Sequence, residues 1–66
     1  MQIFINGDPR DVPDETRMSD LIQLLDLGGK RVAVEVNEEL VPRSTFEAHN
    51  LLPDDRIEII HAVGGG

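Results

Sequence analysis

The chain has 66 residues, enough for one small hydrophobic core but too few for two domains or for an enzyme with a deep cleft. It has no cysteine, which excludes disulfides and thiolate metal sites, and two histidines, His49 and His61, are too few for a convincing metal site. A net charge of −7 disfavours nucleic acids and anionic membranes and favours a basic protein partner. No apolar run approaches the ~20 residues of a membrane span and residues 1–5 lack a charged signal region, so we expect a cytoplasmic protein.

The first half of the chain predicts a β-hairpin followed by a helix. Residues 1–6 alternate between apolar and polar side chains, as in a half-buried strand, and Asn6-Gly7 predicts a type I′ turn. A second strand is expected around residues 10–12, kept short and at an edge by Pro9 and Pro13.

Thr16 is the expected N-cap of the helix, which should end at Gly28-Gly29. One apolar stripe of this helix is predicted to face the core, while its acidic and amide side chains face outward. The stripe is Met18, Leu21, Ile22 and Leu25, and the outward residues are Asp20, Gln23 and Asp26.

The second half predicts three more strands. Residues 31–37 form the clearest one, with Val32, Val34 and Val36 on one face, and after a turn at 37–39 a short return strand at 40–41 stops at Pro42. Residues 44–49 are expected to form one helical turn that is capped by Ser44 and places Phe46 in the core. After a turn at 53–55, residues 56–63 form the last strand. Ile57 and Ile59 should face inward, and Glu58 and Ile60 outward.

This order of elements predicts an α+β domain over residues 1–63, with one main helix across one face of a mixed sheet of four to five strands. No arrangement of side chains indicates catalysis, so the chain is not expected to be an enzyme. The acidic pairs Asp14-Glu15, Glu38-Glu39 and Asp54-Asp55 fall in turns or caps and are interpreted as solvated charges, and His61 as a surface or rim residue.

Three glycines, Gly64, Gly65 and Gly66, follow the last apolar strand and indicate a flexible tail with a free carboxylate. Extended, residues 62–66 would reach about 17 Å, enough for Ala62, Val63 and the glycines to thread into a narrow channel of a partner and deliver the carboxylate to bound ATP. Glu58 and Ile60 on the outer face are candidate partner contacts. The opposing interpretation is an ordinary frayed end on a plain interaction module.

Several segments together resemble the ThiS family of thiamin-biosynthesis sulfur carriers, which are ubiquitin-like β-grasp proteins. The resemblance is carried by the helix ending near Gly28-Gly29, by Val36-Asn37 followed by Val41-Pro42-Arg43, and by the closing residues 57–66. It implies that an E1-like adenylyltransferase adenylates Gly66 with ATP, that a sulfur donor such as a cysteine desulfurase supplies the sulfur of a thiocarboxylate, and that thiazole synthase receives sulfide. The chain itself would bind no cofactor and no metal and would be a monomer when free. The role of Gly64, beyond the Gly65-Gly66 pair that the family requires, stays open.

Two alternative classes of protein share this fold and the glycine end. One is the related carrier of molybdopterin synthesis, and its members resemble this chain less because they are longer and often carry prolines before the tail. The other is a ubiquitin-like modifier joined to lysines of target proteins, which isopeptide conjugates would reveal.

Overall fold

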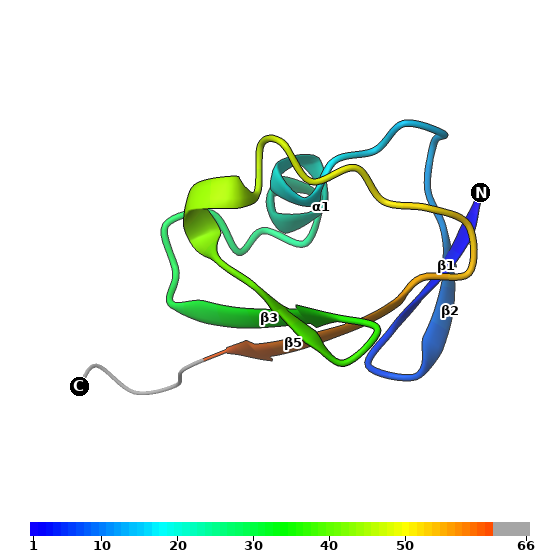
Figure 1. Ribbon diagram of the computed structural model, residues 1–66. Helices are drawn as coiled ribbons and strands as arrows, with labels where there is room; N and C mark the ends of the chain where they lie inside the picture. Colours follow the sequence, from blue (N-terminus) through cyan, green and yellow to red (C-terminus); the bar gives the residue numbers. More distant parts are fainter. Residues whose placement is uncertain (62–66) are drawn as a thin grey trace.

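The computed structural model describes residues 1–61, in which a helix lies across one face of a five-stranded sheet (Figure 1). The elements in chain order are strands β1 (Gln2–Ile5) and β2 (Asp8–Asp11), helix α1 (Met18–Leu24), strands β3 (Val32–Val36) and β4 (Glu39–Val41), the 3-10 turn η1 (Arg43–Thr45) and strand β5 (Arg56–His61). The strand order is β2-β1-β5-β3-β4, with β1 and β5 parallel and the other neighbours antiparallel. The predicted two-layer α+β fold with a mixed sheet is confirmed.

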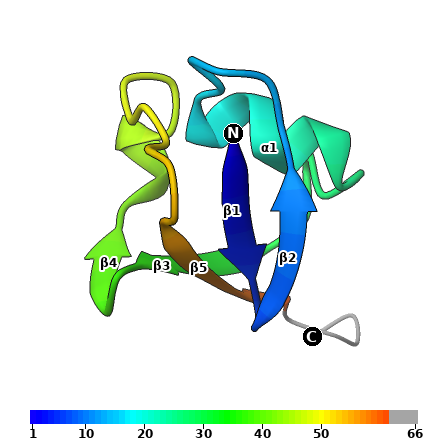
Figure 2. The ribbon, with the colours of Figure 1, turned by 90° about the vertical axis from the view of Figure 1, so that its right-hand side faces the viewer.

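The first hairpin has the predicted turn but a different second strand. Asn6 and Gly7 both have positive φ, 51° and 87°, as a type I′ turn requires. Strand β2 begins directly after this turn, at Asp8, so the expected start at residue 10 was wrong. Proline can stand within β2 because this strand lies at the edge of the sheet (Figure 2), where a missing N–H leaves no neighbouring strand unpaired.

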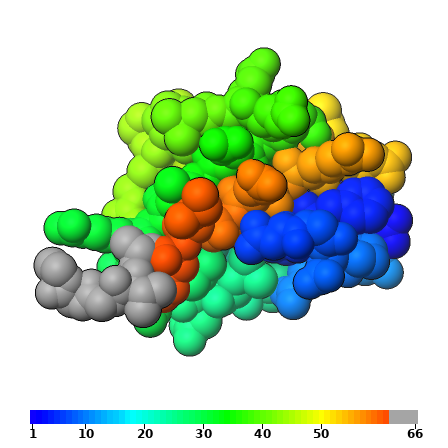
Figure 3. All heavy atoms as spheres, turned by 90° about the horizontal axis from the view of Figure 1, so that it is seen from below, coloured from blue at the N-terminus to red at the C-terminus, as the bar shows by residue number. Residues whose placement is uncertain are grey.

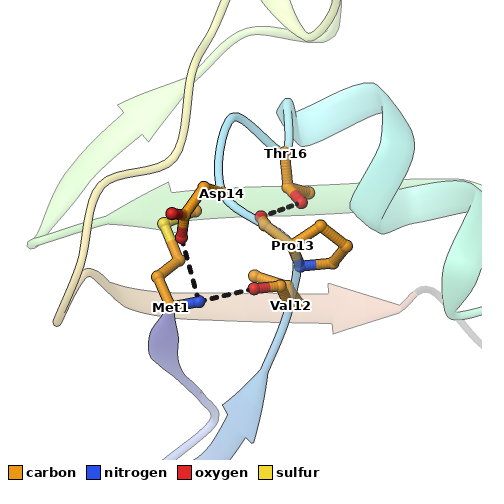
Figure 4. Close-up of polar contacts among 5 residues, drawn as sticks. All are labelled: Met1, Val12, Pro13, Asp14 and Thr16. Carbon is orange, nitrogen blue, oxygen red and sulfur yellow. Dashed lines mark hydrogen bonds and ion pairs between the residues drawn. The ribbon is translucent and has the colours of Figure 1, made fainter.

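The N-terminus of the chain is tied to the segment that follows β2 (Figure 4). The Met1 ammonium group donates a hydrogen bond to the Val12 carbonyl at 2.7 Å and lies 3.2 Å from a carboxylate oxygen of Asp14. The Thr16 hydroxyl points back to the Pro13 carbonyl and donates to it at 2.6 Å. Thr16 therefore does not cap α1, contrary to the sequence-based expectation, because its hydroxyl is used within this loop.

Arg17 is the N-cap residue of α1 instead. Its backbone N–H donates to Oδ2 of Asp20 at 3.0 Å, so an acidic side chain of the first turn binds back to the cap.

The C-terminus of α1 comes earlier than the glycine pair predicted. The helix ends at Leu24, and Asp26 adopts the left-handed conformation with φ 59°. The Asp26 N–H then donates to the Gln23 carbonyl and the Leu27 N–H to the Ile22 carbonyl, which is the hydrogen-bond pattern of a Schellman motif. An aspartate thus takes the place expected for glycine, and Gly28 and Gly29 belong to the next turn.

The core lies between α1 and one face of the sheet. Met18, Leu21 and Ile22 are buried as the stripe predicted, while Leu25 is partly buried. The inward rows of β3 and β5 and Phe46 complete this core as expected. Its buried members are Ile3, Val12, Met18, Leu21, Ile22, Val34, Val36, Val41, Phe46, Leu51, Ile57 and Ile59.

The segment after β4 differs slightly from the prediction. Its helical turn begins at Arg43, directly after Pro42, and not at a Ser44 cap. The Thr45 hydroxyl donates to the Pro42 carbonyl at 2.8 Å. The N–H groups of Thr45, Phe46, Ala48 and His49 each bond to the carbonyl three residues earlier. Proline suits this first position because its fixed φ leads into the turn.

Asp55 is buried, so its interpretation as a solvated turn charge was wrong. Its carboxylate accepts hydrogen bonds from Nδ2 of Asn37 at 3.0 Å and from the Leu52 N–H at 2.8 Å. Asn37 in turn accepts from the Arg56 N–H. The aspartate therefore joins the β3–β4 turn to the start of β5, and the hydrogen bonds satisfy the charge that burial removes from water.

Candidate functional site

The candidate site is the end of β5, the last described strand of the sheet (Figure 1). β5 lies between β1 and β3, but the two neighbours cover different lengths of it. The β1 pairing ends at Ile5, opposite Ile57, whereas the β3 pairing continues to Val32, opposite His61. The last residues of β5 thus have a strand neighbour on one side only.

The Asn6 side chain takes the place of the missing strand residue beside β5. Its Oδ1 accepts from the Ile59 N–H at 2.9 Å and its Nδ2 donates to the Ile59 carbonyl at 3.2 Å. The Asn6 backbone N–H also donates to the Ile57 carbonyl at 2.8 Å. A single amide thus imitates one more residue of β1 and holds β5 two residues before it ends. Sequence analysis gave Asn6 only a role in the turn, because these bonds span 53 residues of the chain.

Replacing Asn6 should lower stability in two separable steps. Asn6→Gly keeps the left-handed turn but loses two hydrogen bonds, which should cost about 1–3 kcal/mol. Asn6→Ala loses the same bonds and also strains the left-handed backbone, so it should cost at least about 1 kcal/mol more. Urea unfolding of both variants measures the two steps. An Asn6→Gly protein as stable as wild type would show that the amide does not hold β5.

The face of the sheet opposite α1 carries the predicted contact residues. Glu58 and Ile60 point outward, as expected, and Ile60 is 65% exposed. By the register of β3 and β5, Glu58 lies beside Glu35 and Ile60 beside Ala33. Along β3 and β5 the open face is therefore apolar at Ala33 and Ile60, near the end of β5, and acidic at Glu35 and Glu58, nearer its middle.

The remaining predicted site residues, Ala62, Val63, Gly64, Gly65 and Gly66, lie outside the described residues. His61, the last described residue, is exposed, as expected for a rim position. In residues 1–61 no three His, Asp or Glu side chains are grouped closely enough to hold a metal ion, and no helix of this part is long and apolar enough to cross a membrane. What the described residues offer is thus a strand, β5, held by Asn6 on one side as far as Ile59 and by β3 on the other as far as His61.

Comparison with known proteins identifies the family. The sequence profile of the ThiS family matches residues 3–66. The chain belongs to the ThiS family of sulfur carriers. The sulfur carrier protein ThiS of Bacillus subtilis is 38% identical over 53 residues, which are 80% of each protein. A crystal structure of the thiamine biosynthesis protein ThiS from Geobacter metallireducens superimposes with a TM-score of 0.84 at 29% identity, over 100% of both chains.

A longer relative contains a similar sequence within a larger protein. A thiazole synthase of Magnetococcus marinus is 39% identical over 66 residues, which are 100% of this chain but 20% of that protein. This chain therefore spans about a fifth of the length of that relative. The ThiS resemblance and the β-grasp fold predicted from the sequence are confirmed.

Proposed function

We propose that this ThiS chain carries sulfur as a thiocarboxylate on Gly66 and delivers it for formation of the thiazole of thiamin. A carboxylate is a poor acyl donor because its leaving group would be oxide. Attack of the Gly66 carboxylate on the α-phosphorus of ATP releases pyrophosphate and forms an acyl-adenylate. A sulfur nucleophile then attacks the acyl carbon and AMP leaves. Hydrosulfide gives the thiocarboxylate directly, whereas a protein persulfide gives an acyl disulfide, which a second thiol of the partner cleaves to the thiocarboxylate while a disulfide forms on the partner. The chain has no cysteine, so the sulfur comes from a partner.

The observation that carries this proposal is the family match, which extends through the glycine end to residue 66. The fold supports it in a second way. In the described residues β5 is hydrogen-bonded on both sides as far as Ile59, which suits a carrier whose proposed reacting group is a backbone carboxylate further along the chain. Such a chain is a co-substrate of other enzymes, and the chemistry of activation belongs to them.

The partners follow from the same chemistry. An E1-like adenylyltransferase binds ATP and uses it to activate Gly66. A sulfur donor such as a cysteine desulfurase provides the sulfur. Thiazole synthase is the proposed acceptor, because the Magnetococcus protein of that name includes a segment similar to this whole chain. Glu58 and Ile60 on the open face contact these enzymes while residues 62–66 thread into them. All of these steps are proposed for the cytoplasm.

Bare backbone at residue 65 is central to this threading. Gly65→Val should block adenylation, because a branched side chain collides with a channel sized for glycine and disfavours positive φ. Stability should change by less than about 0.5 kcal/mol, since the position follows the last strand. ATP-dependent adenylate formation by the cognate adenylyltransferase tests this, with wild type beside the variant. Equal rates would contradict the threaded segment and support an incidental glycine end.

A further inference from the structure

Positive charge gathers where β5 ends, although the chain as a whole carries −7. Lys30 and Arg31 directly precede β3, whose first residue, Val32, pairs with His61 at the end of β5. Arg43 follows β4, whose last residue, Val41, pairs with Val34 of β3. Three of the six Lys and Arg residues thus lie at this end of the sheet, and we call Lys30, Arg31 and Arg43 the cationic collar.

The collar borders an apolar hollow on the open face. Arg31 and Arg43 line a shallow depression of about 360 Å³ together with Val32, Ala33 and Ile60. Figure 3 shows this face, with the end of β5 beside the segment that leads into β3. The exposed side chain of Ile60 lies beside Ala33, so the depression has apolar residues flanked by Arg31 and Arg43.

A hydrogen bond holds the Arg43 side chain of the collar in place. A guanidinium N–H of Arg43 donates a hydrogen bond to the Lys30 carbonyl, which joins the segment after β4 to the segment before β3. The opposite end of the same strands is acidic, because Glu38 of the β3–β4 turn and Glu39 at the start of β4 outnumber Arg56 at the start of β5. The charge of the sheet therefore changes sign along its length, with the positive end at the exit of β5.

We propose that the cationic collar binds carboxylates on the adenylyltransferase that receives the C-terminal segment, around an apolar side chain of that enzyme seated against Ala33 and Ile60. This inference rests on the proposed function and names the chemistry of the partner surface. Net charge alone predicts a basic partner surface. In the proposed function, however, the enzyme binds the residues that follow β5, so the local charge around the end of β5 decides which surface of the enzyme it fits. Guanidinium groups pair with carboxylates in a planar, two-bond geometry, which fixes orientation as well as attraction. The collar thus turns the exit of β5 toward the enzyme during encounter.

Charge reversal at two locations separates the collar from net charge. The variant Arg31→Glu with Arg43→Glu and the control Arg10→Glu with Arg17→Glu both change the net charge from −7 to −11. Arg10 lies on edge strand β2 and Arg17 before α1, away from the exit of β5. A third variant, Lys30→Glu with Arg31→Glu, carries the same net charge but keeps Arg43 and its bond to the backbone of residue 30. Thermal unfolding of each full-length protein checks that it is folded.

Stopped-flow binding to the cognate adenylyltransferase is the measurement. Both collar variants should associate at least about tenfold more slowly than wild type at low salt, while the control associates at the wild-type rate or faster. Equal effects of the collar variants and the control, or no effect of either, would overturn the inference. Unchanged binding to the enzyme together with altered sedimentation of the free chain would also overturn it, because the collar would then bind a second copy of this chain. If the enzyme does not adenylate wild type at all, the proposed function fails. If it adenylates wild type and the collar variants equally fast at limiting concentration, only the collar fails.

Discussion

Removing Gly65 and Gly66 should abolish thiocarboxylate formation and leave the midpoint of thermal unfolding nearly unchanged. The reacting group in the proposed chemistry is the main-chain carboxylate of Gly66, and no side chain can replace it. Within residues 1–61, Ile59 of β5 is the last residue of the buried core. Loss of two residues beyond that strand therefore removes the reaction without removing packing.

Intact-mass measurement after incubation with ATP, the adenylyltransferase and a sulfur donor tests this deletion, and a calorimetric scan serves as its control. A truncated chain that still acquired the oxygen-to-sulfur mass increase would show that the sulfur is carried elsewhere. A large fall in the unfolding midpoint would instead show that the glycines pack against the body.

The second large effect concerns the two faces of β5, which one pair of substitutions can separate. Ile57 faces the core and is 1% exposed, whereas Ile60 faces outward and is 65% exposed. Ile57→Ala should lower the free energy of unfolding by about 2–5 kcal/mol through lost burial and the cavity left behind. A 66-residue domain has about 3–10 kcal/mol in total, so this one substitution would remove a large share of its stability.

Ile60→Ala is the matched control, because it removes the same atoms from the same strand on the other face. It should change stability by less than about 0.5 kcal/mol but weaken binding to the adenylyltransferase. Urea unfolding and equilibrium binding of both variants give the comparison. Equal loss of stability in the two would contradict the assignment of faces, and unchanged binding of the Ile60 variant would remove Ile60 from the contact surface.

The strands and their faces could be predicted because the signal in each is local. Val32, Val34 and Val36 alternate with Ala33 and Glu35, and this period of two persists in the folded sheet. The Asn6-Gly7 turn was predictable for the same reason, since two adjacent residues tolerate positive φ. The glycine end could also be noticed from the sequence, because it follows an apolar strand.

Helix ends were harder to predict because several residues compete for each cap. Thr16 has the right side chain for an N-cap, but the Pro13 carbonyl takes its hydroxyl and Arg17 becomes the cap. Asp26 rather than a glycine adopts the left-handed conformation, since a Schellman motif can close around either. Local preferences do not decide between such neighbours.

Contacts between distant residues could not be predicted from the sequence. The Asn6 amide meets Ile59 only after β1 and β5 pair, and Asp55 meets Asn37 only after the β3–β4 turn packs beside the start of β5. The cationic collar likewise depends on register, because Arg31 and Arg43 come from two segments that the sheet brings to one end. Their side chains alone look like ordinary surface residues.

The central claim is that sulfur is carried on the main-chain carboxylate of Gly66. Its most direct test is intact-mass and C-terminal fragment analysis of the full-length wild-type chain, after incubation with ATP, the adenylyltransferase and a sulfur donor. We expect an oxygen-to-sulfur mass increase that localises to Gly66 and disappears when ATP is omitted. An unchanged mass in the complete mixture, or an increase that localises to any other residue, would contradict it.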